Sequence, residues 1–200
     1  SAPIEVTKGV ENPTLYALSA FRELSERQGI VLKGSCRRGT VPPEAREIFR
    51  FESKPLAAIV RDMNKHSNNF MAETLLKTLG AEFKGTPGTT RKGLEVVRGY
   101  LERIGISTGN LTLVDGSGLA HGNRVTARSL ARTLQAMNED FELWPEFLSS
   151  LPVAGIDGTL QKRFRREELM RKVRAKTGKI AGVGGRAGDA VNETGETFAF

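Results

Sequence analysis

The sequence predicts an α+β fold in which helices come first and an antiparallel sheet follows at the carboxyl end. From Asn12 onward, apolar residues recur at helical spacing behind residues that cap helices well. After Pro152 the pattern changes to short runs separated by glycine-bearing turns, which is typical of strands. We therefore expect a helical region over 12–151 and a sheet-forming region over 173–200. Both are predicted to belong to one domain spanning 1–200.

The composition limits the classes of protein that the chain can represent. A length of 200 residues is enough for a domain with a real core. No apolar run approaches the roughly 18 residues that a membrane helix needs, and Ser1–Glu11 shows no basic stretch followed by an apolar one. Cys36 is the only cysteine, and His66 and His121 stand alone. The sequence therefore predicts no internal disulfide, no metal site and no cofactor.

Cap residues and glycines divide the helical region into segments. We expect a first helix that begins at Asn12-Pro13 and ends at Gly29. Cap-forming residues at 66–69 separate the next two helices. The remaining expectations are a second helix from Ser53 with Pro55 in its first turn, a third ending at Gly80, a fourth capped by Thr89 or Thr90, a short strand over Leu111–Val114, a fifth helix capped by Thr126 and a partly helical segment over Phe141–Leu151.

Three strands are predicted for the carboxyl end. They cover Val173–Ile180, Val183–Val191 and Thr197–Phe200. The segment 192–196 contains a glycine and joins the last two strands as a hairpin.

The net charge of +7 favours acidic partners. Basic residues concentrate between Lys162 and Lys176, where eight of them face only Glu167 and Glu168. Among them only Phe164 is aromatic, whereas surfaces that bind single-stranded nucleic acid usually carry several exposed aromatic rings. We interpret the cluster as a solvated face and expect no nucleic-acid partner. A basic nucleic-acid-binding domain, whose retention on DNA would weaken steeply with salt, is the least favoured alternative.

Two short motifs carry the candidate chemistry. Ser67-Asn68-Asn69 lies at the predicted junction between two helices, and Lys176-Thr177-Gly178 lies on the first predicted strand of the carboxyl end. Each motif has an ordinary structural interpretation. Ser67 and Asn69 could simply cap a helix, and Lys176 could be an exposed cation on a strand.

Together, and in this order, the motifs resemble the second and third elements of the serine penicillin-recognising enzymes, which carry S-x-x-K, then S-x-N, then K-T-G. Longer stretches resemble the class C low-molecular-mass penicillin-binding proteins, which are D-alanyl-D-alanine carboxypeptidases and endopeptidases. The resemblance runs from about Asn12 to Phe200. The stretches that carry it are Ile59–Lys77, Asp115–Leu119, Asn123–Leu130, Leu151–Thr159 and Val173–Gly178.

This resemblance implies a penicillin-binding transpeptidase or β-lactamase-like fold, and it implies roles for six residues. Ser67 would relay a proton to the leaving amine, and Asn69 would hold the catalytic lysine or the substrate amide. Lys176 would supply a positive field that attracts the substrate carboxylate. Thr177 would donate its hydroxyl to that carboxylate, Gly178 would leave room for the substrate, and the backbone N–H of Lys179 would be an oxyanion donor.

The chain departs from the family pattern in two ways. No S-x-x-K occurs in the 200 residues, so the chain contains no nucleophile. Thr74-Leu-Leu-Lys77 has a similar spacing but comes after Ser67 and on an apolar helix. Secondly, Lys179 stands where a small hydroxyl residue commonly follows K-T-G. We therefore expect the carboxy-terminal part of such a domain, incomplete on its amino-terminal side and inactive alone.

The resemblance also implies partners and a compartment. The full-length protein would hydrolyse the D-alanyl-D-alanine termini of peptidoglycan through a serine acyl-enzyme, with cross-links as an additional substrate. Its partners would be stem peptides and β-lactam antibiotics, in the periplasm or cell envelope. The alternative is a non-catalytic module that binds the cell wall. Because the sheet would lack two strands, we expect the chain alone to be poorly stable or to self-associate through an open edge.

Overall fold

The computed structural model describes residues 9–164 and 166–200. Residues 1–8, which make up most of the segment Ser1–Glu11, lie outside the described residues. Arg165 of the basic cluster lies outside them as well. The chain divides into two compact units, Ser1–Glu52 and Ser53–Phe200, and each is described by itself.

The described part of the first unit, residues 9–52, contains one helix, α1 (Pro13–Arg27). It begins as expected, because the backbone N–H of Leu15 donates to Asn12 Oδ1 at 3.1 Å. Gly29, with a positive φ of 77°, follows its end. Arg22 then ties the helix to the following loop by donating to the carbonyl of Gly34.

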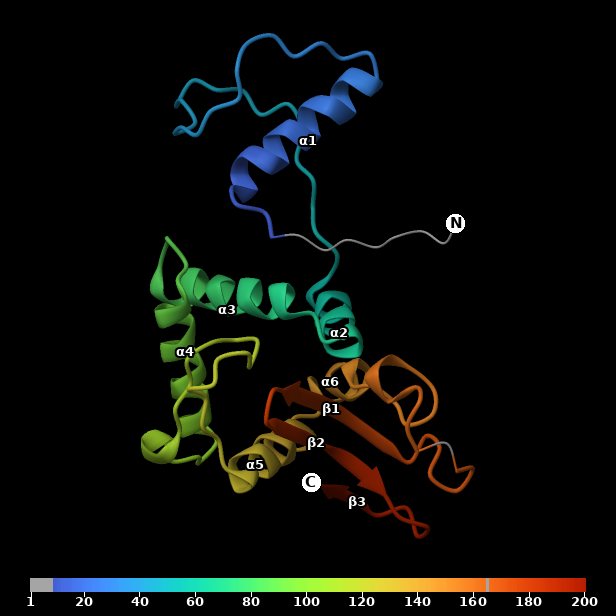
Figure 1. Cartoon of the computed structure of the whole chain (residues 1–200). Coiled ribbons are helices and arrows are strands. Elements are labelled where there is room, and N and C mark those ends of the chain that lie inside the picture. Colours follow the sequence, from blue (N-terminus) through green and yellow to red (C-terminus); the bar gives the residue numbers. More distant parts are fainter. Residues whose placement is uncertain (1–8, 165) are drawn as a thin grey trace. The chain divides into compact units, whose positions relative to one another are not determined.

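The second unit holds five α-helices among its described residues, and the sheet follows them in the sequence (Figure 1). Helix α3 packs along α4, α2 packs against α6, and α5 packs against strands β2 and β3. Two short 3-10 turns, η1 (Thr108–Asn110) and η2 (Gly158–Leu160), connect these elements. The helices are α2 (Leu56–His66), α3 (Asn69–Lys84), α4 (Thr90–Arg103), α5 (Ala127–Asn138) and α6 (Trp144–Ser150).

Three expectations for the helical region were wrong in detail. Helix α2 begins at Leu56 and not at Ser53, because Pro55 adopts an extended backbone with ψ of 146°. Helix α3 continues through Gly80 to Lys84. A Cβ on Gly80 would lie only 2.8 Å from the backbone nitrogen of Gly93 on α4, so this glycine allows two helices to approach closely. The segment 111–114 forms only an isolated bridge between Thr112 and Arg124.

The sheet has the order β1-β2-β3, and every pairing is antiparallel. Its strands are β1 (Val173–Ile180), β2 (Val183–Val191) and β3 (Thr197–Ala199). The bounds of the first two are as predicted, and the third ends one residue early. The register places Lys176 opposite Ala187 and Gly178 opposite Gly185. The segment around Val153 pairs with part of the other edge of β1.

Helices followed by an antiparallel sheet confirm the predicted α+β class. The buried apolar residues come from both parts, since Leu134 lies on α5 and Ala175 on β1. Leu151, Ala154 and Leu160, which are at most 2% exposed, fill the space between them. The segment 151–160 is therefore a rigid connection between the helices and the sheet.

Candidate active site

The junction between α2 and α3 places Ser67 and Asn69. Ser67 ends α2 in the left-handed conformation, with φ of 52°, which is uncommon for a residue other than glycine. Capping falls to Asn68, whose Oδ1 accepts from the backbone N–H of Met71 at 3.0 Å. Ser67 thus caps α2 through its backbone, as the capping interpretation expects, whereas the side chain that caps α3 belongs to Asn68 and not to Asn69. The hydroxyl of Ser67 and the amide of Asn69 are available for another role.

Lys176 on β1 reaches across to this junction. Its Nζ donates to Ser67 Oγ at 2.7 Å and to the carbonyl of Thr177 at 2.7 Å. The two side chains come from positions 109 residues apart in the sequence. Partial burial lowers the pKa of Lys176 below its ordinary value, because the charged form loses hydration. Lys176 makes no ion pair with a carboxylate of the described residues.

Ser67 and Lys176 lie in a cleft of about 540 Å³, called here the Ser67 cleft. Asn69, Thr177 and Gly178 line it as well, so five of the six predicted site residues are brought together. Its described lining contains two cations, Lys176 and Arg186, and no carboxylate. A cleft of this kind attracts anions. The lining is Met63, Asn64, Ser67, Asn68, Asn69, Ala72, Gly116, Ser117, Gly118, Val125, Leu130, Lys176, Thr177, Gly178, Gly185, Arg186 and Ala187.

The remaining predicted residue, Lys179, is exposed and lines an adjoining groove of about 900 Å³, called here the Thr159 groove. Thr177 and Gly178 line both spaces, so the Ser67 cleft and the Thr159 groove share part of β1 as a wall. A Cβ added to Gly178 would meet only one atom, at 4.0 Å. Internal packing therefore does not require glycine at this position.

Some backbone groups of β1 point away from β2, toward the other edge of the strand. The N–H of Ala175 donates away from β2 to the carbonyl of Pro152 at 3.0 Å. Because backbone groups in a strand alternate with a period of two, the N–H groups of Thr177 and Lys179 point to the same edge. The carbonyl of Thr177 follows this pattern, since it accepts from Lys176 there.

Sequence reasoning missed the residues that support the cleft. Lys65, whose side chain is 14% exposed, donates to both carboxylate oxygens of Asp157, at 2.9 and 2.7 Å, and to the carbonyl of Leu151 at 2.6 Å. Thr159, two residues after Asp157, accepts a hydrogen bond of 2.9 Å from the Thr177 hydroxyl. These residues lay within the stretches that carried the family resemblance, but only the fold joins them.

A second support is the loop after Leu111–Val114. Glu73 on α3 accepts from the backbone N–H groups of Gly116 and Ser117, at 3.0 and 2.9 Å. Burial opposes ionisation of Asp115, but hydrogen bonds from the Asn123 amide and from backbone N–H groups outweigh it and hold the pKa of Asp115 below its ordinary value. Both carboxylates thus fix the wall of the Ser67 cleft that Gly116 and Ser117 form.

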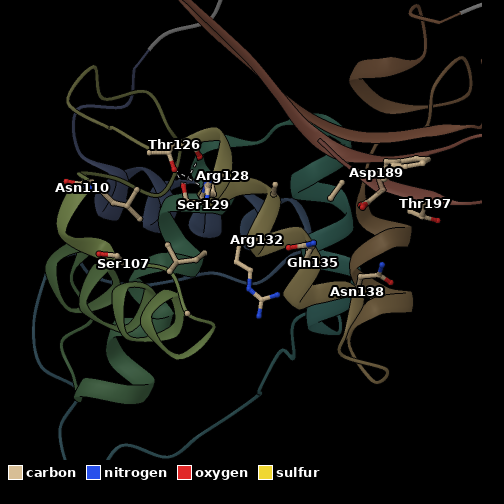
Figure 2. Close-up of a pocket in the computed structure, with 16 residues that line it drawn as sticks. Ser107, Asn110, Thr126, Arg128, Ser129, Arg132, Gln135, Asn138, Asp189 and Thr197 are labelled. Carbon is tan, nitrogen blue, oxygen red and sulfur yellow. Dashed lines mark hydrogen bonds between the residues drawn. The ribbon is translucent and has the colours of Figure 1, made fainter.

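A separate pocket of about 900 Å³ lies between α5 and strands β2 and β3. Figure 2 shows Asp189 and Thr197 on the side of the sheet, and Ser129, Arg132, Gln135 and Asn138 along α5. Asp189 is 5% exposed, and its Oδ2 has no hydrogen-bond partner among the described residues. Burial raises the pKa of Asp189 to about 6.

An α+β fold with a serine at a helix junction and a lysine on the facing strand defines the class of serine penicillin-recognising proteins. The chain belongs to the D-Ala-D-Ala carboxypeptidase 3 (S13) family, whose model matches residues 1–200. The expected fold is confirmed. The structure of penicillin binding protein 4 from Haemophilus influenzae, complexed with a β-lactam, matches 96% of this chain and 45% of that one, with 29% identity and a TM-score of 0.86.

Two curated relatives support the same assignment. The D-alanyl-D-alanine carboxypeptidase DacB of Haemophilus influenzae is 31% identical over an alignment of 202 positions, which covers 99% of this chain and 42% of that protein. A D-alanyl-D-alanine carboxypeptidase of Actinomadura sp. (strain R39) is 36% identical over an alignment of 206 positions, which covers 98% of this chain and 38% of that protein. The chain thus spans about two-fifths of the length of these relatives.

The described residues include neither a helix that could cross a membrane nor a cluster of side chains that could hold a metal ion. None of their helices combines the length and the apolarity needed to cross a bilayer. Their His, Cys, Asp and Glu side chains form no group of three or more that could hold a metal ion.

Proposed function

We propose that this chain supplies the proton relay and the carboxylate-binding strand of a serine D-alanyl-D-alanine carboxypeptidase. In the full-length protein the substrate would be the D-alanyl-D-alanine terminus of a peptidoglycan stem peptide, and cross-links would be a second substrate. A nucleophilic serine from an S-x-x-K segment outside these 200 residues would form the acyl-enzyme. The chain alone would then be inactive.

The single observation that carries this proposal is the hydrogen bond from Lys176 Nζ to Ser67 Oγ, inside a cleft whose described lining has no carboxylate. Because Ser67 accepts from Lys176, its own proton is free to be donated into the cleft. As the bond after the penultimate D-alanine breaks, the departing nitrogen must gain a proton. Ser67 would give up its proton to that nitrogen. It would regain a proton from Lys176 or from the lysine of the S-x-x-K segment, which would have taken the proton of the nucleophilic serine.

The β1 edge supports the docking of the substrate. The charge of Lys176 attracts a terminal carboxylate, and the Thr177 hydroxyl can donate to it. The outward N–H of Lys179 is suited to an oxyanion, since no described backbone group outside the sheet accepts from it. The open space beside Gly178 leaves room for an extended peptide along the strand. Asn69 would contribute its amide from the opposite side.

The test is covalent labelling with a fluorescent penicillin. We expect the full-length protein to be labelled, and the 200-residue chain to remain unlabelled because it has no nucleophile. Ser67→Ala and Lys176→Met in the full-length protein should slow acylation by about 100-fold or more, as the removal of groups that act directly in proton transfer does. An unlabelled full-length protein would exclude the enzyme and favour the non-catalytic cell-wall module.

The expected compartment is the periplasm or cell envelope, because the proposed substrate occurs there. Fractionation of cells that produce the full-length protein would test this. Recovery of the protein with cytoplasmic markers would contradict the placement.

A further inference from the structure

We infer that Thr159 is a second hydroxyl ligand for the substrate carboxylate, and that it takes the part of the hydroxyl residue that commonly follows K-T-G. This inference rests on the proposed function and deepens it. In this chain Lys179 occupies the position after K-T-G, so β1 itself offers only the Thr177 hydroxyl. Thr159 supplies another hydroxyl from a different element, the 3-10 turn η2.

The first support is the position of Thr159. Its Oγ1 lies 2.9 Å from Thr177 Oγ1, and both residues are half-buried and line the Thr159 groove. In the free protein the Thr177 hydroxyl donates to the Thr159 hydroxyl. A hydroxyl rotates freely about its C–O bond, and an ionised carboxylate has about four acceptor positions. When the carboxylate arrives, both hydroxyls can therefore turn outward and donate to it.

The second support is the rigidity of the turn that carries Thr159. Gly158, with φ of 54°, lies so close to α2 that a Cβ on it would be 2.8 Å from the carbonyl oxygen of Lys65. The Lys65–Asp157 ion pair holds the same turn at the residue before Gly158. Lys65 comes two residues before Ser67, so α2 fixes both the relay serine and Thr159. A binding group held by two such contacts loses little freedom when the ligand binds.

The third support is the charge around the pair. The described lining of the Thr159 groove includes Arg163, Lys179 and Arg186, and it contains no carboxylate. These three cations are exposed, so water and salt weaken their attraction for a bound anion. They draw the carboxylate into the groove, whereas directed hydrogen bonds from Thr159 and Thr177 would hold it in one orientation.

The decisive variant is Thr159→Val in the full-length protein, because valine keeps the shape of threonine and removes the hydroxyl. We expect KM for a D-alanyl-D-alanine peptide to rise about tenfold or more, the usual effect of losing a hydrogen bond to a charged group, with a much smaller change in kcat. Thr159→Ser should restore KM. Thr159→Ala is a second variant without the hydroxyl, for use if valine disturbs folding.

Two further measurements separate a binding role from a structural one. Adding Lys179→Thr to Thr159→Val should restore most of the lost affinity, because it puts a hydroxyl at the position after Gly178. For a peptide that ends in D-alanine amide, Thr159→Val should leave KM unchanged, because this peptide has no terminal carboxylate for the Thr159 hydroxyl to bind. An unchanged KM, an equal loss for both peptides, or a failure of serine to restore KM would overturn the inference.

These outcomes are distinct from a failure of the proposed function. If the wild-type full-length protein neither binds penicillin covalently nor hydrolyses the peptide, the proposed function falls and this inference falls with it. If the wild-type protein hydrolyses the peptide and Thr159→Val leaves KM unchanged, only the role of Thr159 is wrong.

Discussion

At the scale of single residues, Ser67 shows how conformation and chemistry combine. Its left-handed backbone ends α2 and places its hydroxyl within hydrogen-bonding distance of Lys176, while the side chain of Asn68 caps α3. A non-glycine residue in this conformation costs on the order of 1 kcal/mol, so the hydroxyl is retained at some expense of stability. A local conformation of this kind is often found at functional sites.

Asp189 leads to a prediction of pH dependence. Its pKa is raised from 3.8 to about 6, so the folded chain binds this proton more tightly than the unfolded chain does. The stabilising effect is complete below about pH 4 and is lost as pH rises through 6. The free energy of unfolding should therefore fall by up to about 3 kcal/mol over this range. Neither Arg174, opposite on β1, nor Arg132 on α5 forms an ion pair with Asp189.

Urea unfolding of the chain between pH 4 and pH 8 measures this effect. Asp189→Asn should remove the fall and leave the chain more stable than the wild type above pH 7. Glu193→Gln, in the exposed hairpin turn, is the matched control and should follow the wild-type curve. If Asp189→Asn and the wild type differ by the same amount at every pH, Asp189 does not titrate as described.

At the scale of elements, the connection between α2 and the segment 151–160 determines the geometry of the site. Lys65 holds this segment, and the segment carries Thr159 and pairs with the outer edge of β1. The elements on both sides of the Ser67 cleft are thus joined by a contact outside the cleft.

Loss of that contact should be costly. Lys65→Met leaves Asp157 partly buried without its counter-ion, so we expect a loss of about 2–3 kcal/mol in the free energy of unfolding. Lys54→Met is the control, because it breaks a more exposed ion pair. Lys54 pairs with Asp62, and the Lys54 side chain is 70% exposed. That change should cost about 1 kcal/mol or less. Equal losses in urea unfolding would show that the Lys65 pair has no special structural role.

At the scale of the whole molecule, the sheet has an edge at β3 that pairs with no other described strand. Phe198 on β3 is 53% exposed, and Phe200 just beyond is 45% exposed. Unpaired backbone groups beside apolar side chains favour pairing with another chain. We predict that the 200-residue chain self-associates through β3 when it is produced alone.

Sedimentation velocity tests this prediction. The sedimentation coefficient of the wild-type chain should rise with concentration, and Phe198→Lys should shift the chain toward the monomer because charge on an edge strand opposes pairing. Phe141→Lys, at a 92% exposed residue outside the sheet, is the control and should leave association unchanged. A wild-type chain that stays monomeric and melts cooperatively would contradict the prediction.

The sequence by itself determined the elements and the family. Helix caps such as Asn12, Thr89 and Thr126 are local signals, because a side chain and a backbone N–H three residues later meet without help from the fold. The bounds of strands β1 and β2 were likewise predicted correctly, because glycine-bearing turns mark their ends. Gly80 was misread as a helix end, since its close contact with α4 is not visible in one segment.

Only the tertiary structure decided which residues form the site. Lys176 and Ser67 are 109 residues apart, and Lys65 and Asp157 are 92 apart, so no local pattern indicates that either pair is in contact. The hydroxyl pair of Thr159 and Thr177 likewise depends on how η2 packs against α2. Side chains acquire partners at such distances through burial and packing of whole elements, which a local sequence pattern does not encode.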